Sequence, residues 1–165
     1  MGMQYDYENN PTFFVDAMLG NIAKKLRLMG YDSKYASDIQ DDDLINLARN
    51  EQRIIISRDE NLVKMALKLE IKSIFLEKQE ETKQFHEIID KLNLKIIEIN
   101  GDRARCPLCN TKTKFVTKDK VRNKISAKIL EQNEKFWECE NCRKIFWEGS
   151  HIRNLRKFVS ELNER

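Results

Sequence analysis

The first hundred residues alternate between short runs with strand character and longer amphipathic segments. The short runs have the length of buried strands and fall at residues 13–15, 33–36, 53–57, 71–76 and 94–99. The longer segments repeat apolar side chains every three or four positions, as helices do, and fall at residues 17–29, 41–48, 61–70 and 82–92. Strands that alternate with helices predict an α/β fold, in which helices cover both faces of a parallel sheet.

Two of these predicted helices have a clear apolar stripe, which should face the sheet. In residues 17–29 the stripe consists of Met18, Ile22, Leu26 and Met29. In residues 61–70 it consists of Leu62, Met65, Ala66 and Leu69.

Acidic residues follow the carboxyl ends of the first three predicted strands. Asp16 comes directly after the first strand, Asp38 and the run 41–43 follow the second, and Asp59 lies two residues beyond the third. Because the carboxyl ends of parallel strands meet at one edge of a sheet, these carboxylates should converge. Carboxylate oxygens suit Mg²⁺ or Mn²⁺, and such a metal can activate water for displacement at a phosphodiester.

Each of these acids also has a purely structural interpretation. Residues 41–43 and Asp59 could cap the helices that follow them. Asp16 is harder to explain in this way, because a carboxylate directly after a buried strand is costly without a partner or a metal. Ser57 could hydrogen-bond a carboxylate or a substrate phosphate and Arg58 could pair with phosphate, or both could be ordinary surface residues.

All four cysteines occur beyond residue 100, in two Cys-x-x-Cys pairs: Cys106, Cys109, Cys139 and Cys142. Four thiolates at this spacing fit a tetrahedral zinc site with no open position, so the zinc would be structural. Two disulfides or an iron–sulfur centre are the alternatives. Residues 1–10 are polar and contain no apolar signal segment, which predicts a cytoplasmic protein, and a reducing cytosol favours metal. We therefore predict an α/β domain over residues 12–100 and a zinc ribbon over residues 101–165.

Charge is distributed unevenly between these two parts. Residues 1–100 contain 14 Lys and Arg against 18 Asp and Glu, whereas residues 101–165 contain 16 against 9. The basic part includes an insertion of 29 residues between Cys109 and Cys139. Its cations are predicted to bind a phosphate backbone, the alternative being an ordinary solvated face: Lys112, Lys114, Lys118, Lys120, Arg122 and Lys124.

Four aromatic residues flank the second cysteine pair: Phe136, Trp137, Phe146 and Trp147. So small a module needs them as a core, which we favour over base stacking. His151 could make a structural hydrogen bond or lie near a substrate phosphate. No apolar run approaches the length of a membrane span, so no membrane partner is expected.

Several motifs, in their order and spacing, resemble a known family. They are Phe-Val-Asp-Ala-Met-Leu-Gly at 14–20, Leu-Arg-Leu-Met-Gly-Tyr-Asp at 26–32, Ser-Arg-Asp at 57–59, the cysteine pairs, and Phe-Trp-Glu-Gly-Ser-His at 146–151. Together they resemble the PIN-like ribonucleases that carry a zinc ribbon, the Mut-seven C-terminal RNase domain family. The resemblance covers nearly all of residues 12–152. It implies a PIN fold, a five-stranded parallel sheet and an acidic, metal-dependent ribonuclease centre.

The resemblance also suggests roles for individual residues. The family's first-strand aspartate corresponds to Asp16, and its Thr-Arg-Asp signature corresponds to residues 57–59, where serine keeps the hydroxyl. The family's middle acids fall within Asp38 and the run 41–43, and its Asp-Glu-Leu is Asp42-Asp43-Leu44 here. The catalytic acids would then be Asp16, Asp38, Asp42, Asp43 and Asp59, with Asp16 and Asp59 on Mg²⁺ or Mn²⁺.

The leading hypothesis is a metal-dependent ribonuclease whose zinc ribbon helps to bind RNA. The main alternative is a non-catalytic module that binds RNA or a ribonucleoprotein. A phosphoacceptor domain built on Asp59 is disfavoured, because Ala17 stands where that chemistry wants a second acid. An antitoxin partner is compatible with the sequence, which does not define the RNA target or the oligomeric state.

Overall fold

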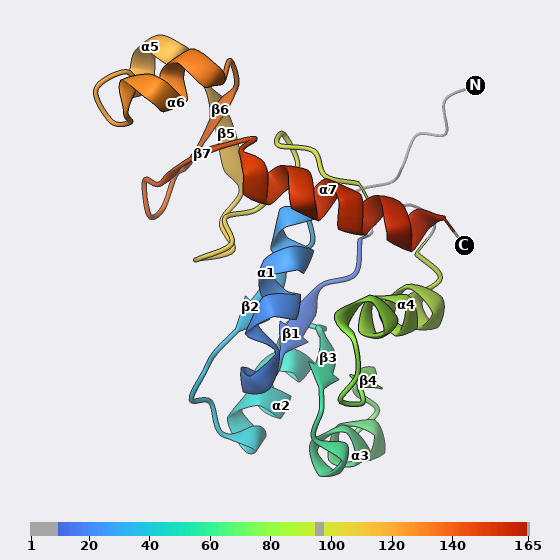
Figure 1. The fold of residues 1–165 in the computed structure, drawn as a ribbon. Helices are drawn as coiled ribbons and strands as arrows, with labels where there is room; N and C mark the ends of the chain where they lie inside the picture. The colour runs from blue at the N-terminus through green and yellow to red at the C-terminus, as the bar shows by residue number, and fades with distance from the viewer. Residues whose placement is uncertain (1–9, 95–97, 165) are drawn as a thin grey trace, which may run out of the picture.

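A parallel sheet of four strands, in the order β2-β1-β3-β4, lies at the centre of the first part of the chain. The computed structural model describes residues 10–94 and 98–164. The strands are β1 (Phe13–Val15), β2 (Ser33–Tyr35), β3 (Ile54–Ser57) and β4 (Ser73–Phe75) (Figure 1). β1 pairs with both β2 and β3. All strands run the same way, so their carboxyl ends share one edge.

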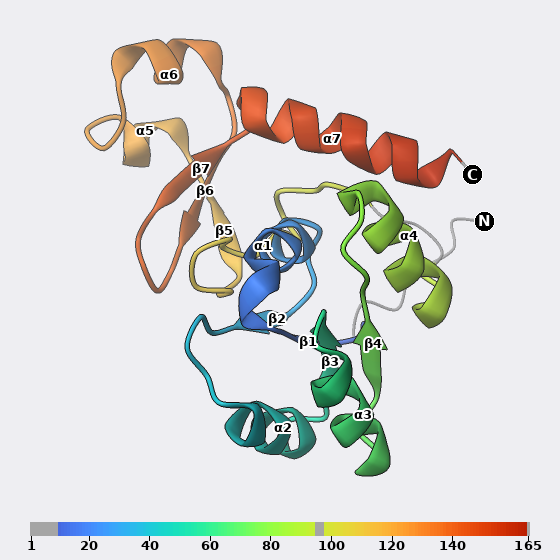
Figure 2. The ribbon, with the colours of Figure 1, turned by 60° about the horizontal axis from the view of Figure 1, so that its bottom comes forward.

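Helices cover both faces of this sheet, which confirms the predicted fold class (Figure 2). One face carries α1 (Gly20–Leu28), which follows a short 3-10 turn, η2 (Ala17–Leu19), and α4 (Glu81–Leu92). The other face carries α2 (Asp41–Asn50) and α3 (Glu60–Lys68). The period of two along a strand explains this division, since Phe13 and Val15 join the first core and Phe14 joins the second.

Three of the residues predicted to face the sheet are exposed instead: Met18 is 72% exposed, Met65 37% and Leu69 45%. Met18 lies in η2, whose tighter turn breaks the helical period on which the stripe depends. In α3 the buried residues are Leu62, Val63 and Ala66. The buried arc is therefore rotated toward Val63, and Met65 and Leu69 fall on its outer flank.

The predicted strand at 94–99 includes residues 95–97, which lie outside the described residues. The five-stranded sheet that the resemblance implied thus stays a prediction at its fifth strand.

The second part of the chain is built on an antiparallel sheet of three strands. These are β5 (Thr113–Val116), β6 (Phe136–Cys139) and β7 (Ile145–Trp147). The insertion between the cysteine pairs adds two short helices, α5 (Lys118–Val121) and α6 (Ala127–Gln132). Phe136 and Trp137 are buried, as predicted, whereas Phe146 and Trp147 are only partly buried.

The last helix, α7 (Ser150–Asn163), leads from the antiparallel sheet back to the parallel one (Figure 1). Its buried residues Leu155, Val159 and Leu162 belong to the same core cluster as α1 and α4. Phe158 makes an edge-to-face contact with Phe85 of α4, with ring centroids 5.3 Å apart. The two predicted domains therefore meet in one hydrophobic core. None of the described helices is long and apolar enough to cross a membrane.

Candidate active site and metal centre

Asp16 lies at the carboxyl edge of the parallel sheet and is held there by the ends of two strands. Its Oδ2 accepts a hydrogen bond of 2.6 Å from the Ser57 hydroxyl, and its Oδ1 accepts one of 2.7 Å from the Ala17 backbone N–H. The Asp16 N–H also donates to the Ile56 carbonyl oxygen of β3. Ser57 is fully buried, so it positions Asp16 and does not offer its hydroxyl to solvent.

Asp59 is the N-cap residue of α3 and is hydrogen-bonded to the same serine. The Ser57 hydroxyl accepts a hydrogen bond of 2.9 Å from the Asp59 N–H. Oδ1 of Asp59 caps the helix by accepting from the N–H groups of Asn61 and Leu62. The capping interpretation is thus confirmed for Asp59. Both capping bonds use Oδ1, so within the described residues Oδ2 is left available for another ligand.

Asp41 is the third carboxylate at this edge, and the charges of nearby acids act on its pKa. It is the first residue of α2, directly after the loop that follows β2. Burial raises the pKa of Asp41, and the negative charges of Asp59, Asp16 and Asp42 raise it further. We refer to Asp16, Asp41 and Asp59 together as the acidic edge.

The other candidate residues lie around this edge. Asp42 and Asp43 are exposed in the first turn of α2, where they complement the positive end of the helix dipole. Asp38 is exposed in the preceding loop. Arg58 is partly buried between Ser57 and Asp59. The sequence pattern does not separate Asp41 from its two acidic neighbours, although its place at the start of the predicted helix is a signal that could.

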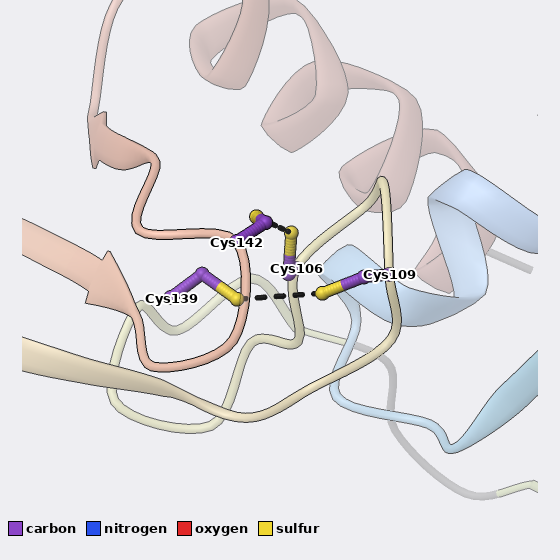
Figure 3. Close-up of side chains that lie close together, drawn as sticks. All are labelled: Cys106, Cys109, Cys139 and Cys142. Atoms are coloured by element: carbon purple, nitrogen blue, oxygen red, sulfur yellow. Dashed lines mark hydrogen bonds between the residues drawn. The ribbon is translucent and has the colours of Figure 1, made fainter.

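The four cysteines form a second, far tighter cluster (Figure 3). Their sulfur atoms all lie within 4.8 Å of one another, with 3.6 Å between Cys106 and Cys142 and 3.4 Å between Cys109 and Cys139. All four are free cysteines. A tetrahedral zinc with Zn–S bonds of about 2.3 Å separates its sulfurs by about 3.8 Å. The donor set and its spacing therefore form a possible metal site that is consistent with zinc.

The two cysteine pairs have the same backbone form. In the first, the Asn110 N–H donates to the Cys106 carbonyl oxygen at 2.8 Å, and in the second the Arg143 N–H donates to that of Cys139 at 2.9 Å. Asn110 and Arg143 both have positive φ, 68° and 61°. Two equivalent loops thus place two sulfurs each. We call the first of them, residues 106–111, knuckle 1.

Hydrogen bonds and burial act on the thiols in opposite directions. Burial raises the pKa of Cys106 to about 12, although the N–H groups of Cys109 and Leu108 act to lower it. At Cys109, burial also acts to raise the pKa, but hydrogen bonding with Thr111 and Asn141 lowers it to about 6. A metal ion would relieve this imbalance by taking all four groups as thiolates.

A polar seam joins knuckle 1 to the parallel sheet. Buried Arg27 donates to the carbonyl oxygens of Ser33 and Pro107, both at 2.8 Å. Asn110 donates to Asp32 at 2.7 Å, and it accepts from the Ser33 N–H at 3.0 Å. Asp32 also pairs with Arg53 at 2.7 Å. These contacts join residues up to 80 positions apart, and no local sequence pattern indicates them.

Most of the predicted RNA-binding cations already have acidic partners. Exposed ion pairs join Lys114 to Glu140, Lys118 to Glu134, and Arg122 to Asp119. Lys124 lies 3.5 Å from Glu138. Among the described residues, Lys112 and Lys120 have no such partner. His151 is exposed in the first turn of α7.

A parallel α/β sheet with acids at its carboxyl edge, joined to a four-cysteine antiparallel module, defines a protein with two candidate metal centres. The model of the Mut7-C RNAse domain matches residues 11–159, so the chain belongs to that family. This confirms the resemblance seen in the sequence and indicates a ribonuclease-type function with RNA as the substrate class. No curated protein and no solved structure matches the chain.

Proposed function

We propose that this protein is a metal-dependent ribonuclease whose acidic edge holds Mg²⁺ or Mn²⁺. The observation that carries the proposal is the convergence of Asp16, Asp59 and Asp41 at the carboxyl edge of the parallel sheet, where Ser57 hydrogen-bonds to both Asp16 and Asp59. Carboxylates that repel one another at a sheet edge are stabilised when a divalent cation binds between them. A cation bound there would lower the pKa of a water and offset charge on the phosphate.

The residues of the edge have distinct parts in this proposal. Asp16 and Asp59 offer carboxylate oxygens from fixed positions, since Ser57 holds both. Asp41 completes the set from the start of α2. Arg58, next to Asp59, is placed to pair with substrate phosphate. Asp38, Asp42 and Asp43 add negative charge around the cation.

The cysteine cluster supports a separate, structural role. We propose that it binds one zinc ion, because four sulfur ligands leave no position for water or substrate. A cytoplasmic location would keep the thiols reduced and able to bind the metal.

A non-catalytic RNA-binding module is the second candidate. One observation favours it: among the described residues, only the cysteines form a group of possible ligands close enough to share one ion. For metal-dependent catalysis, the carboxylates of the acidic edge must therefore move closer together around the cation.

The test is cleavage of a mixed RNA pool by the full chain, with Mg²⁺, with Mn²⁺ and with a chelator. We expect metal-dependent cleavage, which Asp16→Asn should remove. Asparagine keeps an oxygen for the Ala17 N–H bond but is a poor ligand for a hard cation. Glu131→Gln, an exposed change on α6, is the matched control. RNA binding without cleavage in any metal would support the non-catalytic candidate, and equal cleavage by wild type and Asp16→Asn would place the centre elsewhere.

A further inference from the structure

A cavity of about 580 Å³ lies away from the acidic edge, where the two parts of the chain meet. Its walls come from the second half of α1, knuckle 1, strands β6 and β7, and the first turn of α7. This volume lies within the range of ligand-binding pockets. We call it the ribbon cavity.

The walls of the ribbon cavity are largely apolar and aromatic. The side chains that matter for binding are Leu28, Leu108, Trp137, Phe146, Trp147 and Ile152. Trp137 is buried and forms part of the core, whereas Phe146 and Trp147 stay partly exposed. Leu108, at the tip of knuckle 1, is 52% exposed. Such a wall offers flat surfaces on which a base can stack.

The rim of the cavity carries a surplus of positive charge. Lys24 and Lys144 line it beside His151, and both lysines are exposed and have no side-chain partner among the described residues. The acid on the rim, Glu148, is already paired with Arg156 at 2.6 Å. Aromatic walls inside a cationic rim are the combination that single-stranded nucleic acids require, with stacking for the base and cations for the phosphate.

We propose that the ribbon cavity binds a nucleotide of single-stranded RNA outside the cleavage site. The base would lie against Phe146, Trp147 and Leu108, and its phosphate would contact Lys24 and Lys144. The inference rests on the proposed function in taking RNA as the ligand.

The geometry of α1 sets the span between the two sites. Lys24 and Leu28 lie 8 and 12 residues beyond Asp16, which is roughly 12–18 Å along a helix. An RNA strand that follows α1 would therefore engage both the acidic edge and the cavity, and the cavity would fix which phosphodiester reaches the acids.

The chain provides a direct probe, because it has only two tryptophans and both line the cavity. The experiment titrates zinc-loaded full chain carrying Asp16→Asn with a short oligouridylate and, separately, with uridine monophosphate. Intrinsic tryptophan fluorescence reports occupancy of the cavity, and anisotropy of a labelled oligouridylate reports total binding. We expect saturable quenching, with the oligouridylate binding more tightly than the monophosphate.

Matched variants locate the binding. Leu108→Glu places a negative charge on the wall and should weaken binding of the oligouridylate roughly ten-fold or more. Leu67→Glu, on α3, is its control because Leu67 is also 52% exposed. Lys144→Ser and Lys24→Ser should each flatten the log–log salt dependence by about 0.7, while Lys68→Ser on α3 should not. Zinc content shows whether Leu108→Glu keeps knuckle 1 intact.

Equal anisotropy binding by Leu108→Glu and Leu67→Glu, with unchanged salt slopes in both lysine variants, would overturn the inference. Equal affinity for uridine monophosphate and the oligouridylate would also overturn it, in favour of a site for free nucleotides. Cleavage by the wild-type chain is measured separately. Quenching without any cleavage would count against the proposed function alone, and cleavage with no effect of the cavity variants would count against the cavity alone.

Discussion

The cysteine cluster and the acidic edge both gather negative ligands, yet they are built in opposite ways. The four sulfurs lie within 4.8 Å of one another because two equivalent backbone loops place two sulfurs each. The three carboxylates of the edge come from three elements, and Asp16 and Asp59 are each fixed by local hydrogen bonds. The first arrangement is already formed for a permanent ion, and the second has room for a cation that arrives with substrate and water.

The two centres also differ in what surrounds them. Knuckle 1 is joined to the sheet through Arg27, which is buried, and through Asp32 and Asn110, which are partly buried. In the acidic edge, Asp41 and Asp59 are exposed at the N-terminal ends of α2 and α3. The cysteine cluster should therefore control stability, and the acidic edge should control activity with little effect on stability.

The largest effect should follow removal of the zinc. Cys139→Ser, or a strong chelator, should unfold the β5–β7 module, since zinc supplies about 10–16 kcal/mol in comparable small sites. Because α7 follows that module and completes the core over α1 and α4, stability of the parallel sheet should fall as well. Elemental analysis should find one zinc per chain, and near-ultraviolet circular dichroism of the zinc-free chain should show no tryptophan signal. A zinc-free chain that keeps this signal, or two disulfides in fresh protein, would contradict the prediction.

The next largest effect should distinguish Asp41 from its neighbours Asp42 and Asp43. Asp41→Asn should lower metal-dependent cleavage by about two orders of magnitude, as expected for a group that helps to hold charge at the reacting phosphate. Asp42→Asn and Asp43→Asn should lower it far less. Because the pKa of Asp41 is raised, its carboxyl takes up a proton at a higher pH than an ordinary aspartate. Manganese affinity, measured by calorimetry, should therefore weaken as pH falls through that raised pKa. Equal reductions of cleavage in all three variants would contradict a special role for Asp41.

The sequence predicts the two candidate metal centres better than it predicts the contacts that join the two parts of the chain. The positions of the first four strands, the cluster of four cysteines and Asp16 follow from local patterns: a buried run that ends in an acid, and a repeated Cys-x-x-Cys. The buried face of α3 does not follow from such patterns, because its apolar residues extend over more of the helix circumference than the part that packs on the sheet. The polar seam and the ribbon cavity depend on contacts between distant residues, such as Arg27 with Pro107, and periodicity carries no information about these.

A smaller effect, on the free energy of unfolding, should come from a substitution in the polar seam. Arg53 and Asn110 lower the pKa of Asp32, although burial alone would raise it. Asp32→Asn should cost about 2 kcal/mol at neutral pH, as for hydrogen bonds to a charged group. A carboxyl with a lowered folded pKa stabilises the fold above its unfolded pKa, and this contribution disappears as pH falls through the folded value. Denaturant unfolding should thus show the two proteins converging below about pH 4.

The control for this prediction is Asp119→Asn. Asp119 is in an exposed pair with Arg122, and such pairs contribute about 0–1 kcal/mol. A cost for Asp32→Asn that stays constant down to acid pH would show that the seam acts through packing and not through the charge of Asp32.

The smallest effect should come from the basic insertion, and it tests whether the second part of the chain contacts RNA there. Lys112 and Lys120 lack acidic partners among the described residues, whereas Lys118 and Arg122 have them. The double variant Lys112→Ser/Lys120→Ser should flatten the log–log salt dependence of RNA binding by about 0.7 for each phosphate that the protein no longer neutralises. Lys118→Ser/Arg122→Ser should leave the slope unchanged, because a lysine or arginine held by a neighbouring acid releases no counterion from RNA. Equal slopes in both variants would mean that the insertion is a solvated face, and the RNA contacts of this part would then be confined to the rim of the ribbon cavity.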